Sequence, residues 1–200
     1  HGNASWGEDG DRCSPRPFGA LLSDDAGRIH AFRGNLSFRL DGGGDGQHPW
    51  PLPHVWPGLR GGVDAAFAWE GRSYLIQGSQ VWVFLSGRGH RLVSGYPRPL
   101  QEELGVPRAD AAFTCPGSPL LYLITGDRVQ RVDLRQSPRG GQEEGPLPHG
   151  GVDGAMCTPE GVFLFRGGSF HLYPGVRELL GARHPAPPQS IAPRFLQCPQ

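Results

Sequence analysis

His48, in a loop rich in Gly and Pro, is the residue whose type and setting most suggest ligand chemistry. Trp50 follows two residues later in the same loop, which runs over residues 45–51. A neutral imidazole is a good metal ligand, and an aromatic side chain beside it can form an apolar wall for a flat ligand. Residue types alone favour a plainer interpretation, in which His48 is a surface histidine and Trp50 packs against its neighbours. His54, just before a Pro-Gly connector, is expected to be structural or exposed.

Three aspartates form a second group of candidate ligands. Each precedes a similar apolar segment, in Asp64-Ala65-Ala66-Phe67, Asp110-Ala111-Ala112-Phe113 and the looser copy Asp153-Gly154-Ala155-Met156. The copies lie about 45 residues apart, a period typical of repeat proteins. If the repeats surround a central channel, carboxylates at its mouth would suit a hard cation such as Ca²⁺ or Na⁺. Alternatively, each aspartate caps a turn or accepts hydrogen bonds from backbone amides. Gly19 stands at this position in the first repeat.

Motifs for catalysis are missing from the sequence, so we expect no enzyme activity. There is no HExxH, GxSxG, P-loop or GxGxxG pattern at a strand-to-helix junction. Glu143-Glu144 is interpreted as a solvated charge pair, not a catalytic dyad. The formal net charge is zero, which gives no electrostatic reason to expect nucleic acid as a partner. No apolar run approaches the length of a membrane span, so membrane insertion is not expected either.

The elements that must position these residues are short strands. The 32 Gly and 21 Pro fall between apolar runs, as turns do in an all-β fold. Four repeats of three to four strands follow, each with a central hairpin glycine, and residues 101–104 and 176–181 suggest helical turns. The sequence therefore predicts a single four-bladed β-propeller with blades at about 13–59, 60–106, 107–149 and 150–198. Residues 1–12 are polar and are expected to be the tail of an interdomain linker.

The four cysteines, Cys13, Cys115, Cys157 and Cys198, are too widely spaced for a zinc site built from CxxC pairs. Their even number fits two disulfides, for which three pairings exist. A ring of blades must hold its two ends together, and Cys13–Cys198 would join the first blade to the last. Cys115–Cys157 is then the natural second bridge, because both lie near the same strand position of adjacent repeats. Disulfides and the two N-glycosylation sequons, at Asn3 and Asn35, together predict a secreted glycoprotein.

The chain resembles the hemopexin family in a combination of features. These are the four repeats, the Asp-Ala-Ala-Phe opening, a Cys pair that would join the two ends, and the segment Gly95-Tyr96-Pro97-Arg98-Pro99-Leu100. The resemblance covers the chain from Cys13 onward. Within the family, residues 74–78, 93–97 and 110–118 are most similar to the C-terminal propeller of the plasma haem-binding members. Matrix metalloproteinases and vitronectin carry related propellers, to which these segments are less similar.

The resemblance implies a haem-transport module that shares its site with a linker and an N-terminal propeller. In such proteins two axial histidines hold haem, one from the linker and one from a first-blade loop that residues 45–51 match here. It thereby assigns His48 as an axial ligand and Trp50 as its neighbour, although Gln47 stands where the family often has an aromatic residue. His1 lies at the end of the linker, but the second ligand is not identified.

The resemblance further implies a channel ion, Ca²⁺ or Na⁺, near Asp64, Asp110 and Asp153, and a clearance receptor as a partner. The alternative is an extracellular protein–protein interaction propeller, as in metalloproteinases or vitronectin, with no role in binding haem.

Overall fold

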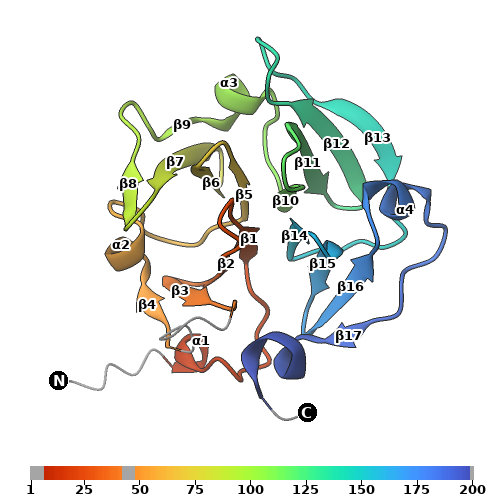
Figure 1. The fold of residues 1–200 in the computed structure, drawn as a ribbon, viewed down its shortest axis with the longest axis horizontal. Helices are drawn as coiled ribbons and strands as arrows, with labels where there is room; N and C mark the ends of the chain where they lie inside the picture. Colours follow the sequence, from red (N-terminus) through yellow and green to blue (C-terminus); the bar gives the residue numbers. More distant parts are fainter. Residues whose placement is uncertain (1–6, 42–47, 199–200) are drawn as a thin grey trace.

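The computed structural model describes residues 7–41 and 48–198. Four antiparallel sheets stand around a central axis, and in each sheet the strands follow one another in sequence order from the axis outward (Figure 1). The fold is therefore the predicted all-β, four-bladed propeller. None of the helices among the described residues is long and apolar enough to cross a membrane.

In the described ranges the blades contain seventeen strands, and short helical segments link them. Blade one contains β1 (Ala20–Ser23), β2 (Ile29–Arg33), β3 (Leu36–Arg39) and β4 (Trp50–Pro51). Blade two contains β5 (Ala65–Trp69), β6 (Arg72–Gln77), β7 (Gln80–Ser86), β8 (His90–Leu92) and β9 (Arg98–Pro99), the last of which pairs with β7. Blade three contains β10 (Ala111–Thr114), β11 (Leu120–Thr125), β12 (Arg128–Asp133) and β13 (Gln142–Pro146). Blade four contains β14 (Gly154–Thr158), β15 (Gly161–Arg166), β16 (Ser169–Tyr173) and β17 (Gln189–Ser190). The helical segments are α1 (Gly7–Gly10), α2 (Leu52–Val55), α3 (Leu100–Leu104), α4 (Val176–Gly181) and a π-helical turn, Ala192–Leu196.

The hydrophobic core consists of four clusters, one at each interface between neighbouring blades. The inner strands supply two clusters at once. On β5, Ala65 and Phe67 pack toward blade three, whereas Ala66 and Ala68 pack toward blade one. Because successive strand residues point to opposite faces, a blade with neighbours on both sides needs apolar residues at every inner position. This explains why the inner strands are continuous apolar runs in the sequence.

Outer strand β13 contains Glu143 and Glu144, which the sequence suggested as a solvated charge pair, and no strand was expected there. Glu143 forms an ion pair with Arg128, with Oε1 and Nη2 2.6 Å apart, and Glu144 forms one with Arg131, with Oε1 and Nε 3.0 Å apart. Both carboxylates thus face arginines of the neighbouring strand β12. An outer strand buries little of either face, so its sequence carries no apolar alternation that would reveal it.

The aspartate before the inner strand ties that strand to the hairpin turn of its own blade. The distances from the turn glycine N to the aspartate Oδ2 are nearly the same in three blades: Gly78 to Asp64, 2.7 Å; Gly126 to Asp110, 2.7 Å; Gly167 to Asp153, 2.6 Å. These three glycines have φ values of +58°, +62° and +55°, a conformation that glycine adopts without steric cost. The aspartates therefore hold the hairpins of blades two, three and four in place.

Blade one has Gly19 instead of aspartate and receives its carboxylate from outside the repeat. Asp9 of α1 places Oδ2 beside Gly34, the turn glycine, so closely that a Cβ atom on Gly34 would lie 2.7 Å away. Arg33 donates a hydrogen bond from Nη1 to the Asp11 carbonyl oxygen at 2.8 Å. The described part of the predicted linker tail, residues 7–12, is thus packed on blade one.

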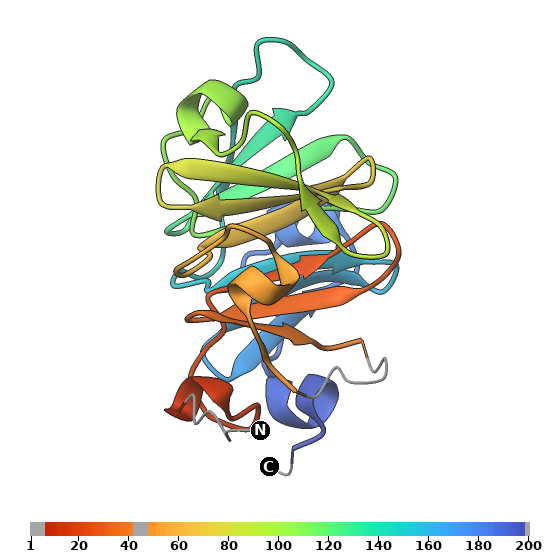
Figure 2. The same cartoon turned by 90° about the vertical axis from the view of Figure 1, so that its left-hand side faces the viewer.

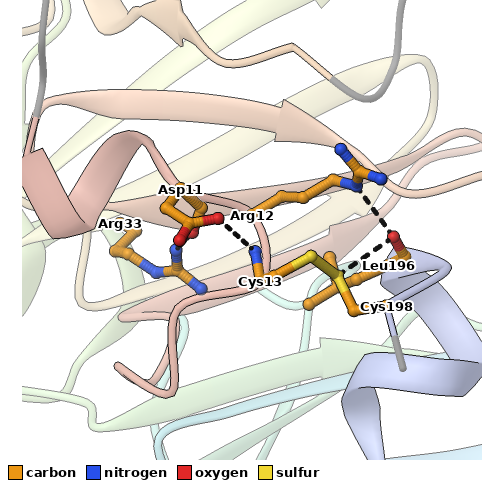
Figure 3. The surroundings of a disulfide bond; sticks show 6 residues. All are labelled: Asp11, Arg12, Cys13, Arg33, Leu196 and Cys198. Carbon is orange, nitrogen blue, oxygen red and sulfur yellow. Dashed lines mark hydrogen bonds between the residues drawn. A yellow bond between two sulfur atoms is a disulfide. The ribbon is translucent and has the colours of Figure 1, made fainter. Parts of the chain in front are cut away.

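The ring closes where α1 and the C-terminal π-helical turn lie side by side (Figures 1 and 2). Cys13 and Cys198 form a disulfide there with Cα atoms 5.7 Å apart, and Arg12 Nε donates a hydrogen bond to the Leu196 carbonyl at 2.9 Å (Figure 3). The predicted link between the first and last blades is confirmed. A second disulfide, Cys115–Cys157, joins blades three and four with Cα atoms 4.8 Å apart.

We expect the double substitution Cys13→Ser/Cys198→Ser to destabilise the protein more than Cys115→Ser/Cys157→Ser. The two bridges span 185 and 42 residues, for which loop-closure entropy gives about 5 and about 4 kcal/mol respectively. Removing the first bridge also frees the ends of the ring. Urea unfolding of both variants measures the difference, and a smaller loss for the Cys13/Cys198 variant would contradict ring closure as the stabilising role.

Asp110→Ala should lower the free energy of unfolding by about 1 kcal/mol, because the Gly126 amide loses its acceptor at a solvent-exposed site. Asp110→Asn keeps an acceptor oxygen and should cost less. Thermal or urea unfolding measures both variants. Equal stability of the alanine variant and the wild type would show that the hydrogen bond to the turn contributes nothing.

Candidate functional site

His48 and Trp50 lie at the outer edge of blade one, where β4 begins. β4 pairs with β3 so that Trp50 stands opposite Ser37 and Pro51 opposite Leu36. His48 is exposed, Pro49 is buried, and Trp50 keeps 42% of its surface exposed. Pro49 and the strand pairing therefore fix the chain directly after His48, while the imidazole and the indole remain accessible. The rest of the predicted loop, residues 45–47, lies outside the described residues.

The helical turn α2 folds back over β4 and completes the exposed surface. Leu52 is fully buried and donates its backbone N–H to the Asn35 carbonyl at 2.8 Å, which fixes the start of α2. His54 is thereby stacked on Trp50, with ring centroids 5.0 Å apart and an angle of 8° between the planes. His54 was expected to be structural or exposed; it is exposed, and its contact with Trp50 was not predicted. The only signal for it is the four-residue spacing across a strand-to-helix junction.

This arrangement has the chemistry of one wall of a ligand site. An exposed imidazole can bind a metal ion, and a flat, exposed ring stack can pack against a planar aromatic ligand. The stack also fixes the orientation of the indole before any ligand arrives. Three pockets lined by described residues lie elsewhere. One of about 440 Å³ lies beside Trp69 and Arg135, one of about 380 Å³ lies at the β7–β8 hairpin, and one of about 180 Å³ lies where the inner strands end, near Ser23 and Thr114. His48 lines none of these three.

The three aspartates expected near a channel ion do not form a metal site. Each carboxylate accepts a hydrogen bond from its own hairpin turn, as described above. No group of three or more His, Cys, Asp or Glu side chains in the described part of the chain could hold a metal ion. The observed role is the alternative considered from the sequence, in which aspartate bonds a backbone amide. The three aspartate side chains therefore form no ligand cluster for Ca²⁺ or Na⁺ in the described part of the chain, and we do not propose a channel ion.

Asn35 is exposed in the hairpin turn between β2 and β3, a position that would accommodate a glycan. Its side-chain Oδ1 accepts a hydrogen bond from Gly61 N at 2.8 Å. Ser37, the third residue of the sequon, is buried, and its hydroxyl lies 3.2 Å from Trp56 Nε1, which donates to it. Modification of Asn35 stays a prediction, and Asn3 and His1 lie outside the described residues.

Two pairs of histidines lie close together between strands, and neither pair is predicted from the sequence. His30 and His90 have ring centroids 5.4 Å apart, and those of His149 and His171 are 4.7 Å apart. Burial lowers the pKa of His90 and of His149 to about 4. The partners come from different strands or blades, so no local spacing could have revealed them.

Comparison of the sequence and the fold with known proteins agrees with the four-bladed propeller. The Hemopexin family model matches residues 63–108, which contain blade two. Hemopexin from Homo sapiens is 41% identical over 199 residues, covering 90% of this chain and 43% of the relative. Hemopexin from Danio rerio is 33% identical over 190 residues, covering 94% and 42%. Vitronectin from Oryctolagus cuniculus is 35% identical over 144 residues, covering 66% and 30%. The chain spans less than half the length of these relatives.

Among solved structures, the hemopexin fold protein CP4 from cow pea matches with a TM-score of 0.72. It covers 90% of this chain and 95% of its own, at 16% identity, so it supports the fold alone. The identity to hemopexins extends over nine tenths of the chain and coincides with the four blades and the closing disulfide. On these grounds the chain belongs to the hemopexin family.

Proposed function

We propose that this chain is a haem-binding module in which His48 supplies one axial ligand to the haem iron. The observation that carries the proposal is the exposed imidazole of His48 beside the exposed Trp50–His54 stack. The similarity of this chain to hemopexins over 90% of its length supports the same function. Haem is flat, aromatic and largely apolar, so an indole plane next to a ligating histidine fits both its iron and its ring.

Each residue of this surface has a distinct role in the proposal. His48 binds iron through a neutral imidazole, and Trp50 packs against the macrocycle. His54 is a positioning residue that holds the indole plane. Two axial imidazoles leave haem iron no open coordination position, which suits transport and sequestration instead of oxygen chemistry. The module is accordingly a binding protein, not an enzyme.

The site is incomplete in this chain, because His48 and Trp50 form one wall on an open surface. We infer that a linker and an N-terminal propeller supply the second histidine and the opposite wall. The chain spans 43% of the human relative, a length that leaves room for both. Two disulfides and the exposed sequon at Asn35 support a secreted plasma glycoprotein, and a clearance receptor would be a further partner.

The decisive substitution is His48→Ala in this chain joined to its linker and N-terminal propeller. With ferric haem, the wild type should show the low-spin absorption spectrum of iron with two axial imidazoles. His48→Ala should lose one axial ligand and give a five-coordinate, high-spin spectrum with weaker binding. His184→Ala removes another exposed histidine and should leave the spectrum unchanged.

Two results would contradict the proposal. A low-spin spectrum that persists unchanged in His48→Ala would remove His48 from the site. Tight, stoichiometric binding of haem by this chain alone, with two histidine ligands, would show that the site is not shared.

Trp50→Ala should weaken haem binding by about tenfold, the value of one lost aromatic stacking contact. The low-spin spectrum should persist at saturating haem, because both axial ligands remain. A haem titration followed by absorbance measures the affinity, with Trp69→Ala as a matched control on another blade. Unchanged affinity in Trp50→Ala would place the macrocycle elsewhere.

The second candidate function is an extracellular protein–protein interaction propeller without haem. The similarity to vitronectin, 35% identity over 144 residues, supports it. Failure of the folded, joined protein to bind ferric haem would favour this function over haem transport.

A further inference from the structure

The interface between blades one and two is built around Trp56, which is fully buried. Its ring contacts Phe32 of blade one, with centroids 5.7 Å apart, and Phe84 of blade two, at 5.3 Å. The indole Nε1 donates to Ser37 on β3. Trp56 follows α2 in the connector between the blades, so it links the apolar faces of both.

Two histidines, one from each blade, lie against this tryptophan. His90 on β8 stacks on Trp56 with ring centroids 3.8 Å apart and a 20° interplanar angle. His30 on β2 contacts the same indole edge-on, with centroids 5.2 Å apart and a 70° angle. His30 is 2% exposed and His90 is half-buried. The imidazoles thus form part of the packing between the blades.

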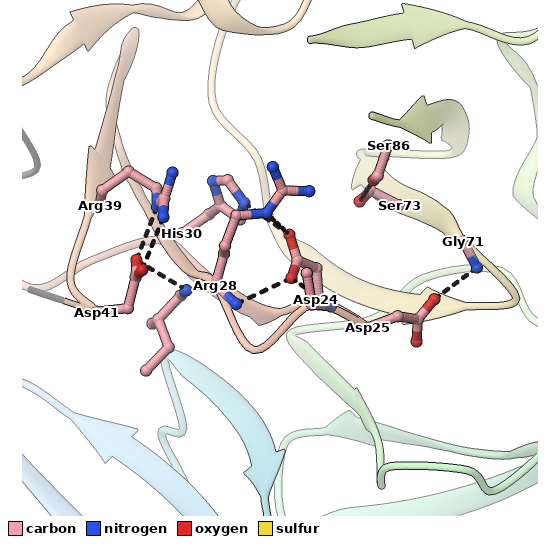
Figure 4. Close-up of polar contacts among 11 residues, drawn as sticks. Asp24, Asp25, Arg28, His30, Arg39, Asp41, Gly71, Ser73 and Ser86 are labelled. Atoms are coloured by element: carbon pink, nitrogen blue, oxygen red, sulfur yellow. Dashed lines mark hydrogen bonds and ion pairs between the residues drawn. The ribbon is translucent and has the colours of Figure 1, made fainter. Parts of the chain in front are cut away.

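The hydrogen bonding of both imidazoles fits their neutral forms. His30 Nε2 lies 3.2 Å from Asp24 Oδ2 (Figure 4). The Nδ1 atoms of His30 and His90 are buried without a hydrogen-bond partner in the described structure. A neutral imidazole carries one N–H, whereas the protonated ring carries two and would leave a buried donor unpaired. Proton uptake therefore disfavours the closed interface at both histidines.

The charged groups around the pair do not offset this cost. Asp24 faces His30, but its Oδ2 atom also forms an ion pair with Arg28 Nε at 2.8 Å. Arg39 bonds Asp41 at 2.7 Å, and both arginines raise the local positive potential (Figure 4). From blade two, the rings in contact with Trp56 are those of His90 itself and of Phe84, and the other blade-two residues of this cluster are uncharged. Two imidazolium ions 5.4 Å apart would also repel each other.

The direction of the pKa shifts agrees with the geometry. Burial lowers the pKa of His30, and it lowers that of His90 to about 4. Burial would raise the pKa of Asp24, but hydrogen bonds from His30 and from the Arg28 amide outweigh burial and lower it to about 2. Asp24 is thus ionised throughout the range in which the histidines titrate. Once solvated, a histidine regains a pKa near 6.5, so the stability of the interface is full above that pH and falls as pH drops toward 4.

The other three interfaces are held differently. A disulfide joins blades four and one, Cys13–Cys198, and another joins blades three and four, Cys115–Cys157. The pair His149 and His171 lies near blades three and four, where the disulfide limits separation. The interface of blades two and three has no disulfide, and the buried histidines of the described residues all lie elsewhere. Among the described residues, only the interface of blades one and two combines a buried and a half-buried histidine with no disulfide across it.

We propose that the interface of blades one and two is an acid-sensitive opening point, where protonation of His30 and His90 separates these blades while the rest of the ring stays closed. The proposal does not depend on haem binding. Each proton taken up on opening raises the ratio of open to closed molecules by about tenfold per pH unit. Two histidines can therefore give a rise of up to about a hundredfold per pH unit below pH 6.

Hydrogen–deuterium exchange of this chain, with both disulfides intact, tests the opening. Exchange is measured between pH 7 and 5 and corrected for the intrinsic exchange rate of each peptide. Opening in peptides from α2 and from β7–β8 should rise at least tenfold per pH unit below pH 6. Peptides from β11–β12 should change less than twofold, because their blade faces contain neither histidine.

Two variants separate the histidines from general acid sensitivity. His90→Phe keeps a ring against Trp56 and removes a titrating group, so the slope at this interface should fall by about tenfold per pH unit. His30→Gln keeps an N–H donor for Asp24 and should lower the slope similarly. His184→Gln, at an exposed position, should leave the slope unchanged.

Equal slopes in all four blades, or slopes unchanged in both His30→Gln and His90→Phe, would overturn the proposal. If these variants fail to fold, NMR titration of the wild-type imidazoles decides the question. Both rings staying neutral at pH 5.5 in the closed state supports it, and ordinary titration near pH 6.5 in that state overturns it.

Discussion

Closure of the ring is the constraint on which the rest of this structure depends. Each blade has apolar residues on two faces, and a face is buried only when the neighbouring blade covers it. Three of these contacts join blades that are consecutive in the chain, but blades one and four must meet from opposite ends of the sequence. The Cys13–Cys198 disulfide, with the Arg12–Leu196 hydrogen bond beside it, holds that contact. Once the ring is closed, the outer strands have fixed positions, and β4 can present His48 and Trp50 on a rigid edge.

Histidines in this fold have two contrasting surroundings. His48 is exposed just before β4, and its role as a haem ligand is our proposal. His30 and His90 are packed against Trp56, where a neutral ring adds apolar contact and a proton is costly. Aspartate shows the same dependence on context. Asp64, Asp110 and Asp153 look like cation ligands in the sequence, yet each serves the hairpin turn of its own blade.

Much of the fold is predictable from the sequence because its determinants are local and periodic. The Asp-Ala-Ala-Phe repeat, the hairpin glycines and the four cysteines together indicate the blades and the closing disulfide. Contacts between blades have no such signal: the His30–His90 pair joins residues of different strands. β13 was missed because ion pairs, not apolar alternation, hold its side chains. In the candidate site, the family resemblance alone singles out His48, and its role as an axial ligand stays a prediction. The Trp50–His54 stack depends on the turn from β4 into α2. The many prolines in this segment suggest a loop, so neither element is predictable from the sequence there.

We propose that this chain provides an axial histidine to a haem shared between two propellers. The sharpest test is a crystal structure of the chain joined to its linker and N-terminal propeller, with ferric haem bound. We expect electron density from a His48 imidazole nitrogen to the iron, with the Trp50 indole packed against the macrocycle. Iron bound by two other histidines, with His48 in solvent, would contradict it.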